Sequence, residues 1–267
     1  MLPSAAVPGA AAVWVADRLA GPPHHGAVVH AGDAAVYFRS AEDVIGVVSR
    51  HATAIPCSIS TRADSVAEIF AGRLPAVGDE VRVGDGIADF SGHGVRVGRY
   101  VDFAMRPFDV AQVPAMREAL EATDPASWLP DELDASVRDA LRRDPAATLE
   151  QVLGRGSGLT PFGDDVVCGI LATLLAADDP CAPRLQERVT ELAPRRTTAL
   201  SATLLRRAGA GDVLPDFAAV VTALLERPAE APAAIAHLRT VGHTSGAGML
   251  LGHCLALAHI HTRSCCP

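Results

Sequence analysis

The residues best suited to chemistry lie in one glycine-rich segment, residues 154–165, which reads GRGSGLTPFGDD. An apolar stretch with helical character follows it directly. Glycine lets the backbone adopt positive φ and lets a ligand approach the amides closely, while free amides at a helix start favour an anion. The segment therefore predicts a cradle for a phosphate or a carboxylate. Its expected ligand-binding residues are Gly156, Ser157, Gly158, Thr160 and Gly163.

Two adjacent carboxylates, Asp164 and Asp165, end this segment. They would repel an anion unless they bind a cation or orient a hydrogen-bond donor. Both are catalytic candidates, and they could hold Mg²⁺ through water, although no direct metal ligand is assigned. The alternative is structural: a tight turn in which Asp164 caps the following helix.

A second candidate segment, residues 242–248, reads GHTSGAG and precedes an apolar helical stretch. His243 would lie beside free helix amides, where a histidine can act as a general acid or base. Thr244 and Ser245 are expected to bind substrate. The alternative is that these two residues only cap the helix and that Gly246 and Gly248 permit close helix packing.

A third candidate segment, residues 195–201, reads RRTTALS. Arginine grips a carboxylate or phosphate through two parallel hydrogen bonds, and residues four apart share a helix face. These residues could therefore add charge and hydroxyl donors to an anion site. The alternative is an ordinary solvated helix start. The expected substrate-binding residues here are Arg195, Arg196, Thr197, Thr198 and Ser201.

Composition excludes several classes of protein. The chain has 267 residues, of which 49% are hydrophobic, a composition typical of globular proteins. Its formal net charge is −8, and it has no run of basic residues that would bind nucleic acid. It contains no lysine. Walker-type phosphate loops, protein kinases and pyridoxal-phosphate enzymes all need a lysine, so these mechanisms are excluded.

Cysteine and histidine spacing predicts no metal site and no disulfide framework. None of the six cysteines forms a CxxC pair, and no HExxH pattern occurs. His259 and His261 are two apart, so on a helix they point in different directions. With no membrane-length apolar run and no signal-peptide pattern, a cytoplasmic location is expected.

The elements that must position these residues change type along the chain. Residues 1–24 are expected to form an N-terminal arm, with a short helix as the alternative. Alternating valine-rich runs predict a β-rich domain over 25–108, a small barrel or a sandwich, whose strands are expected to be antiparallel. Helical spacing predicts a mostly helical domain over 109–267. The expected fold class is therefore α+β. The strands are expected at 26–31, 34–39, 80–83, 86–90 and 94–97, and the helices at 63–72, 131–143, 147–153, 164–177, 183–192, 197–208, 215–226, 231–240 and 245–259.

The three candidate segments together resemble a known bacterial family. The strings GxGLTPxGDD at 156–165, TxLS at 198–201 and GHTSG at 242–246 occur in the order seen in a family catalogued as a domain of unknown function. Its better-known members resemble the H subunit of oxamate carbamoyltransferase, from anaerobic allantoin breakdown. The resemblance is strong over about 154–252. The alanine and arginine bias and the lack of lysine indicate a divergent member.

The resemblance implies a carbamoyltransferase-like activity: phosphorolysis of oxalurate to oxamate and carbamoyl phosphate. It also implies partner subunits, one of them similar to acyl-CoA synthetases. Assembly of this chain into a homo-oligomer is a further possibility. Two alternatives remain. The chain could be a non-catalytic subunit that binds a ligand or partner. It could also be a lyase, hydrolase or other transferase of specialised metabolism that reuses the same anion pocket.

Overall fold

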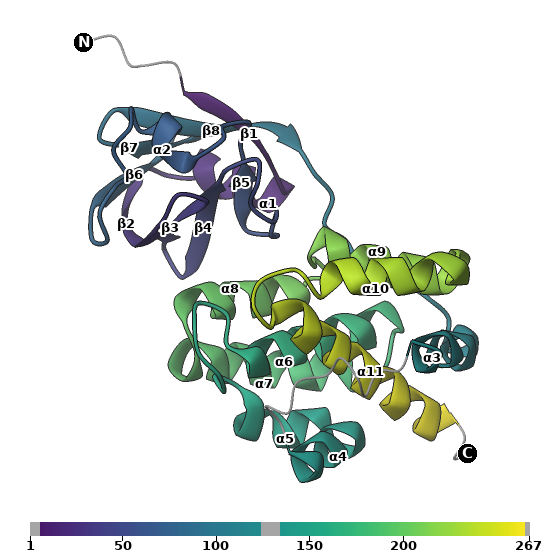
Figure 1. Ribbon diagram of the computed structural model, residues 1–267. Coiled ribbons are helices and arrows are strands. Elements are labelled where there is room, and N and C mark those ends of the chain that lie inside the picture. Colours follow the sequence, from purple (N-terminus) through teal and green to yellow (C-terminus); the bar gives the residue numbers. More distant parts are fainter. Residues whose placement is uncertain (1–5, 124–133, 265–267) are drawn as a thin grey trace. The chain divides into compact units, whose positions relative to one another are not determined.

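The computed structural model describes residues 6–123 and 134–264 (Figure 1). The predicted helix start at 131–133 and the vicinal Cys265 and Cys266 lie outside these residues. By its internal contacts the chain divides into two compact units, Met1–Asp102 and Phe103–Pro267. Each unit is described by itself.

The first unit is a closed β-barrel, which confirms the predicted β-rich N-terminal part of an α+β fold. Its strands follow one another around the barrel in the order β1-β5-β4-β3-β2-β6-β7-β8. Most neighbours are antiparallel, but β1 pairs with β8, and β4 with β5, in parallel. The strands are β1 Val7–Ala11, β2 His24–Ala31, β3 Ala35–Ser40, β4 Asp43–Val48, β5 Ser58–Ser60, β6 Glu80–Gly84, β7 Ile87–Phe90 and β8 His93–Tyr100.

Of the residues expected to form an N-terminal arm, 7–11 form a barrel strand instead, and 13–20 form the short helix that was the alternative. Strand β1 closes the sheet against β8, and helix α1, Val13–Ala20, follows it with Val15 and Leu19 fully buried. Proline and glycine within β1 hide its strand character in the sequence. The glycine has a packing reason, because a Cβ on Gly9 would lie 2.5 Å from Cγ2 of Ile59 on β5.

Strands β4 and β5 were also missed. Every residue of β4 is buried, so the strand lacks the alternation that marks a half-exposed strand. Strand β5 is three residues long. The predicted helix at 63–72 shrinks to α2, Val66–Ile69.

The second unit is helical, as predicted. Its α-helices are α3 Val113–Glu121, α4 Ala135–Arg143, α5 Pro145–Val152, α6 Phe162–Ala176, α7 Ala182–Arg196, α8 Ala199–Ala208, α9 Pro215–Glu226, α10 Ala231–Leu238 and α11 Ser245–Ser264, with 3₁₀ turns at Val110–Gln112 and Pro228–Glu230. Helix α3 was not predicted. The described residues after Tyr100 contain no strand beyond an isolated bridge, Ala104 to Asp212.

Helices α6 and α11 form the centre of this unit and cross at close range (Figure 1). Glycines make the approach possible. A Cβ on Gly169 would lie 2.2 Å from the Met249 carbonyl oxygen, and one on Gly252 would lie 2.1 Å from that of Val166. The apolar stretch predicted to be a helix at 164–177 is therefore this central helix, and nearly every residue of α6 is buried.

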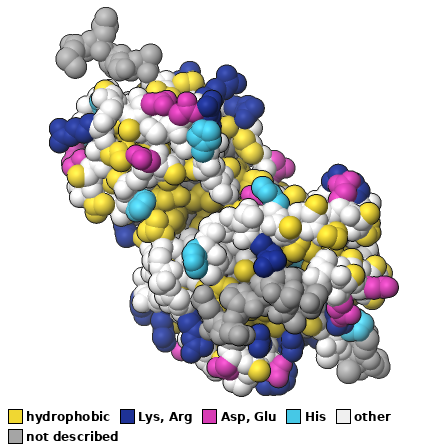
Figure 2. All heavy atoms as spheres, viewed as in Figure 1, with side chains coloured by type: hydrophobic (Ala, Val, Ile, Leu, Met, Phe, Trp, Pro, Cys, Tyr) yellow, Lys and Arg dark blue, Asp and Glu magenta, His cyan; other side chains and the backbone are white. Residues whose placement is uncertain are grey.

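No helix within residues 6–123 and 134–264 combines the length and apolarity needed to cross a membrane. On the face drawn in Figure 2, arginines and carboxylates are intermingled rather than separated into patches of one sign. Many of them form exposed ion pairs, such as Arg188 with Glu150 and Arg227 with Glu230.

Candidate functional site

Asp164 connects the glycine-rich loop to the start of helix α8. Its side chain is fully buried. Oδ1 accepts a 2.6 Å hydrogen bond from the Gly154 amide, and Oδ2 accepts one from the hydroxyl of Ser201 at 2.7 Å and another from that of Thr197. Two of the three predicted segments therefore meet at one carboxylate.

This arrangement shows that Asp164 does not cap the following helix, which was the structural alternative. Helix α6 begins at Phe162, with Pro161 at the N-cap position and no side-chain cap. Asp164 lies inside the first turn and accepts from another segment instead of from the amides of its own helix. The Gly163 amide donates to the Arg155 carbonyl oxygen at 2.8 Å, so it is not free to bind an anion.

The loop before α6 owes its path to glycines. Gly154, Gly156 and Gly158 have φ of 78°, 114° and 90°, the left-handed region that favours glycine. A Cβ on Gly154 would also lie 2.0 Å from the Arg196 carbonyl oxygen. The loop therefore packs directly on the end of α7.

The tip of this loop is exposed. Ser157 and its two flanking glycines lie at the surface. Among the described residues, the backbone N–H groups of Gly156, Ser157 and Gly158 donate to no protein acceptor. Three neighbouring amides are therefore without protein partners in a loop that turns through positive φ at its glycines.

Asp165 reaches the remaining predicted segment, residues 242–248. Its side chain is 2% exposed and its carboxyl group accepts a hydrogen bond from Ser245, the first residue of α11. The Ser245 hydroxyl is in turn 3.0 Å from Oγ1 of the half-buried Thr160 in the glycine-rich loop. A chain of hydroxyls therefore runs from the buried Asp165 to the loop.

The two carboxyl groups differ in their hydrogen bonding. Burial raises the pKa of Asp164, and the bonds from Thr197, Ser201 and Gly154 oppose that rise. Burial raises the pKa of Asp165 well above its usual value, and the neighbouring Asp164 raises it further. Oδ2 of Asp165 has no hydrogen-bond partner. With three donors at Asp164 and one at Asp165, these surroundings favour the protonated form more strongly at Asp165 than at Asp164.

The remaining predicted residues lie at the edge of this centre. Thr198 caps α8 by accepting from the Ser201 amide at 3.0 Å, and it donates to the Leu159 carbonyl oxygen at 2.6 Å. Arg195 and Arg196 are exposed at the end of α7, where Arg196 pairs with Glu150 at 3.3 Å.

The turn before α11 is also peripheral. His243 is exposed, and Thr244 is half-buried with its carbonyl oxygen accepting from the Gly248 amide. The packing expected of the two glycines is confirmed. A Cβ on Gly246 would lie 1.8 Å from the Leu238 carbonyl oxygen, and one on Gly248 would lie 2.8 Å from Cβ of Asp165.

Sequence reasoning placed no role on Cys168, which lies one helical turn after Asp164. Its pKa is raised well above the usual thiol value by burial and by the two nearby carboxyl groups. The thiol therefore stays protonated and unreactive, as is usual for a cysteine buried in apolar surroundings. The spacing of four on an apolar helix was the signal that could have placed it beside the acid pair.

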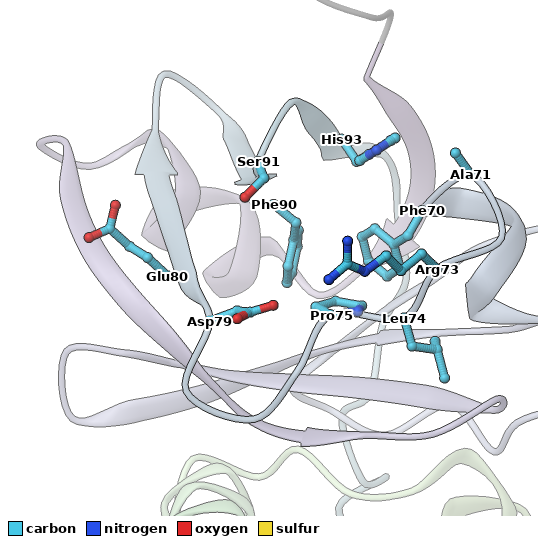
Figure 3. Close-up of a pocket in the computed structure, with 10 residues that line it drawn as sticks. All are labelled: Phe70, Ala71, Arg73, Leu74, Pro75, Asp79, Glu80, Phe90, Ser91 and His93. Carbon is cyan, nitrogen blue, oxygen red and sulfur yellow. The ribbon is translucent and has the colours of Figure 1, made fainter.

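A separate cavity of about 440 Å³ lies in the barrel unit (Figure 3). None of the predicted site residues lines it. The Phe70 and Phe90 rings, whose centroids are 5.0 Å apart, form part of its apolar lining, and Arg73 and His93 supply polar groups. Of the acidic side chains at its edge, Asp79 accepts from the Ala76 amide and Glu80 pairs with His25, so both are engaged.

These features define a two-unit protein: a closed barrel, then a helical unit with a buried acid pair under an exposed glycine-rich loop. Residues 152–257 match the protein-family model described as oxamate carbamoyltransferase subunit AllH. The match covers all of the segment from the loop to the middle of α11, and it confirms over that range the resemblance predicted from the motifs. No curated protein and no solved structure matched the chain.

Proposed function

We propose that this chain is a carbamoyltransferase-like enzyme or enzyme subunit. It binds a small ureido or carboxylate substrate together with phosphate or carbamoyl phosphate at the glycine-rich loop. One observation carries the proposal: the acid pair at the start of α6 hydrogen-bonds to residues of all three motifs. The segment matched by the oxamate carbamoyltransferase family model contains every one of these residues.

The loop amides supply the anion site in this proposal. The N–H groups of Gly156, Ser157 and Gly158 belong to exposed residues and have no protein partner among the described residues. They bind a phosphate or carboxylate, and they stabilise the oxyanion that develops when a carbamoyl carbon is attacked. No lysine exists in the chain to do this, so backbone donors and arginine are the remaining means.

The hydroxyl chain supplies the proton. Burial favours the protonated form of Asp165. In that form Asp165 donates to Ser245 instead of accepting from it, Ser245 donates to Thr160, and Thr160 donates to the ligand at the loop. Such a relay delivers hydrogen-bond donation to a developing negative charge or a leaving nitrogen. Asp164 positions the loop against α8. His243, near the turn that begins α11, remains a candidate for a second proton carrier.

The acid pair suits hydrogen bonding better than a hydrated Mg²⁺. Magnesium keeps several waters and needs ionised carboxylates. The Asp164 oxygens already accept three donors, and Oδ2 of Asp165 is sealed from solvent. The proposal therefore routes no step through a metal at this pair.

A second candidate function is a ligand-binding subunit whose chemistry is completed by a partner similar to acyl-CoA synthetases. The exposure of His243, and the ion pair that occupies Arg196, favour this alternative. In that case a partner subunit would supply the remaining residues of the site next to His243 and Arg196. Turnover by the purified chain alone separates the two candidates, because the binding subunit binds its ligand but shows none.

A thermal-shift panel tests the proposal. Carbamoyl phosphate, phosphate, oxamate, a ureido acid and a nucleotide are each added to the wild-type chain, with and without Mg²⁺. A ligand at one hundred times its dissociation constant adds about 2.7 kcal/mol to the unfolding free energy. We expect carbamoyl phosphate or the phosphate and oxamate pair to raise Tm, and the nucleotide to leave it unchanged.

The Thr160→Val variant tests whether that shift arises at this loop. It keeps the side-chain shape and removes the hydroxyl, so the shift should fall. Thr190→Val on α7 is the matched control, since Thr190 is exposed and bonds only to the Gln186 carbonyl oxygen. A panel in which no small anion shifts the wild type would overturn the proposal, and so would an equal shift in Thr160→Val.

A further inference from the structure

Three side chains with metal-binding atoms meet in the helical unit, away from the acid pair. Asp179 follows α6, Cys181 precedes α7, and His259 belongs to α11. One potential ligand atom from each lies within 4.8 Å of the others. Asp179 and His259 are buried, at 7% and 4% exposure, while Cys181 is half-buried.

The turn that carries Asp179 and Cys181 is fixed by its own hydrogen bonds. Asp178 adopts φ of 51° and ends α6, and the Asp179 amide turns back to the Leu174 carbonyl oxygen at 2.9 Å. The Cys181 amide then donates to Oδ1 of Asp179 at 2.8 Å. This bond engages Oδ1 and fixes the orientation of the carboxylate, and with it the position of Oδ2.

The ring of His259 is held in one tautomer. Its Nδ1 lies 2.9 Å from the carbonyl oxygen of Arg142 in the last turn of α4. A carbonyl oxygen only accepts, so Nδ1 carries the proton and Nε2 carries the lone pair. Metal-binding histidines usually donate their other ring N–H in this way.

The Nε2 atom of His259 is buried and has no hydrogen-bond partner. Leaving a buried polar atom unpaired costs free energy, so such an atom in a folded protein calls for an explanation. The neighbouring Cys181 and Asp179 provide one, since imidazole, thiolate and carboxylate together are a ligand set of zinc.

The charges are consistent with a divalent ion. A thiolate and a carboxylate balance the charge of Zn²⁺, and the imidazole stays neutral. Arg263 donates from Nη1 to Sγ of Cys181 at 3.2 Å, which favours the thiolate form and can persist as an outer contact of a bound metal. Without a metal, burial and the Asp179 carboxylate raise the pKa of the thiol.

We propose that Asp179, Cys181 and His259 form a zinc-binding site. Three protein ligands leave the fourth tetrahedral position for water, which reaches the site on the half-exposed side of Cys181. Ligand atoms around a tetrahedral zinc lie about 3.5 Å apart. Since the three ligand atoms here lie within 4.8 Å of one another, binding needs a movement of no more than about 1.3 Å between any two of them. The metal joins the end of α6, the start of α7 and the last turns of α11.

Cobalt titration provides the test, because Co²⁺ replaces Zn²⁺ and reports a thiolate ligand by a charge-transfer absorption band. The Cys265→Ser/Cys266→Ser background removes the vicinal tail thiols as competing ligands. We expect one Co²⁺ per chain, with a thiolate band and visible bands of tetrahedral intensity. Zn²⁺ should then bleach these bands and raise Tm.

Variants assign the ligands. In the same background, Cys181→Ser should abolish the thiolate band, and His259→Gln should weaken Co²⁺ binding on the order of a hundredfold, since even outer-shell changes typically cost 10–100-fold. His261→Gln on the same helix is the matched control and should bind as the background does. If a variant fails to fold, the folded background chain still decides the question. A background without a thiolate band, or a band that survives in Cys181→Ser, overturns the proposal.

Discussion

The hydroxyl of Ser201 donates a 2.7 Å hydrogen bond to Oδ2 of Asp164, and this bond joins two motifs that are 37 positions apart in the sequence. Both side chains are buried. Ser201→Ala removes the donor and leaves the carboxylate with fewer partners in a place without water. We expect the unfolding free energy to fall by about 1.5–3 kcal/mol, the usual cost for a hydrogen bond to a charged group.

Ser136→Ala is the matched control for this change. Ser136 also donates to an aspartate, Oδ1 of Asp134, at 2.6 Å, but that pair is exposed. The control should change stability by no more than about 0.5 kcal/mol. Urea unfolding measures both variants, and equal effects would show that the Asp164 network adds nothing beyond a surface bond.

Asp165→Asn should separate stability from function. A carboxyl whose pKa is raised in the folded state costs stability once pH exceeds its unfolded value, because the unfolded chain releases a proton that the folded chain retains. The neutral amide removes this cost. We expect the variant to be at least about 1 kcal/mol more stable at pH 7, with the difference shrinking toward pH 4.

Ligand binding should weaken in the same Asp165→Asn protein, since the relay loses its proton. Urea unfolding at several pH values measures the stability, and calorimetry measures the binding. A variant that is less stable at pH 7 and binds normally would show that Asp165 is an ordinary structural residue. Asp139→Asn, an exposed change on α4, controls for loss of negative charge.

The crossing of α6 and α11 should be intolerant of a methyl group. Gly169→Ala places a Cβ 2.2 Å from the Met249 carbonyl oxygen, a backbone atom that cannot rotate away. We expect a loss of about 1–3 kcal/mol from overpacking, visible as a lower Tm. A Cβ on Gly209 would lie 3.2 Å from the flexible Gln186 side chain and 3.3 Å from the Arg206 carbonyl oxygen, which is much less close, so Gly209→Ala should cost far less than Gly169→Ala. Equal melting of the two variants would contradict the close approach.

His253 should make the protein sensitive to acid. Its ring is fully buried beside Phe217 and bonds through Nδ1 to the Thr173 hydroxyl at 2.8 Å. Burial lowers the pKa of His253 to about 3. Between pH 6.5 and about 3 the unfolded chain therefore binds a proton that the folded chain does not, and stability falls as pH falls.

The slope from His253 alone is about 1.4 kcal/mol per pH unit. In His253→Gln the unfolding free energy should depend less on pH between pH 6.5 and pH 4.5. Its slope should be smaller by the amount that corresponds to about one proton, whatever the stability of the variant at pH 7. Unfolding free energies measured across this range provide the check. A curve with the same slope in wild type and variant would mean that the ring is protonated in the folded protein.

Local sequence patterns predicted the two-part fold well where the hydrophobic residues of an element show a clear periodicity. The alternating strands β6 and β8 and the apolar helix α6 were found for this reason. Strand β4 was missed because all six of its residues are buried, and β1 because proline and glycine mask a strand that only barrel closure stabilises. Such closure depends on pairings between residues far apart in the chain, which no window of sequence contains.

The same distinction applies to the candidate sites. The three motifs marked the segments that meet at the acid pair. The helix-capping interpretation of Asp164 was wrong because its partners are the Gly154 amide and the Thr197 and Ser201 hydroxyls, and none is an amide of its own helix. The zinc proposal has no signature in the sequence at all. Asp179 and Cys181 lie far along the chain from His259, and the spacing of His259 and His261 indicated no metal.

The central claim is that the exposed loop binds a small anion through its amides and the Thr160 hydroxyl. Isothermal titration calorimetry with freshly dissolved carbamoyl phosphate tests it most directly, on wild type, Thr160→Val and the control Thr190→Val. The account predicts one site per chain in the wild type and the control, and a dissociation constant at least about tenfold higher in Thr160→Val, as expected for one hydrogen bond to a charged ligand. Equal affinity in all three proteins, or no binding heat in the wild type, would contradict it.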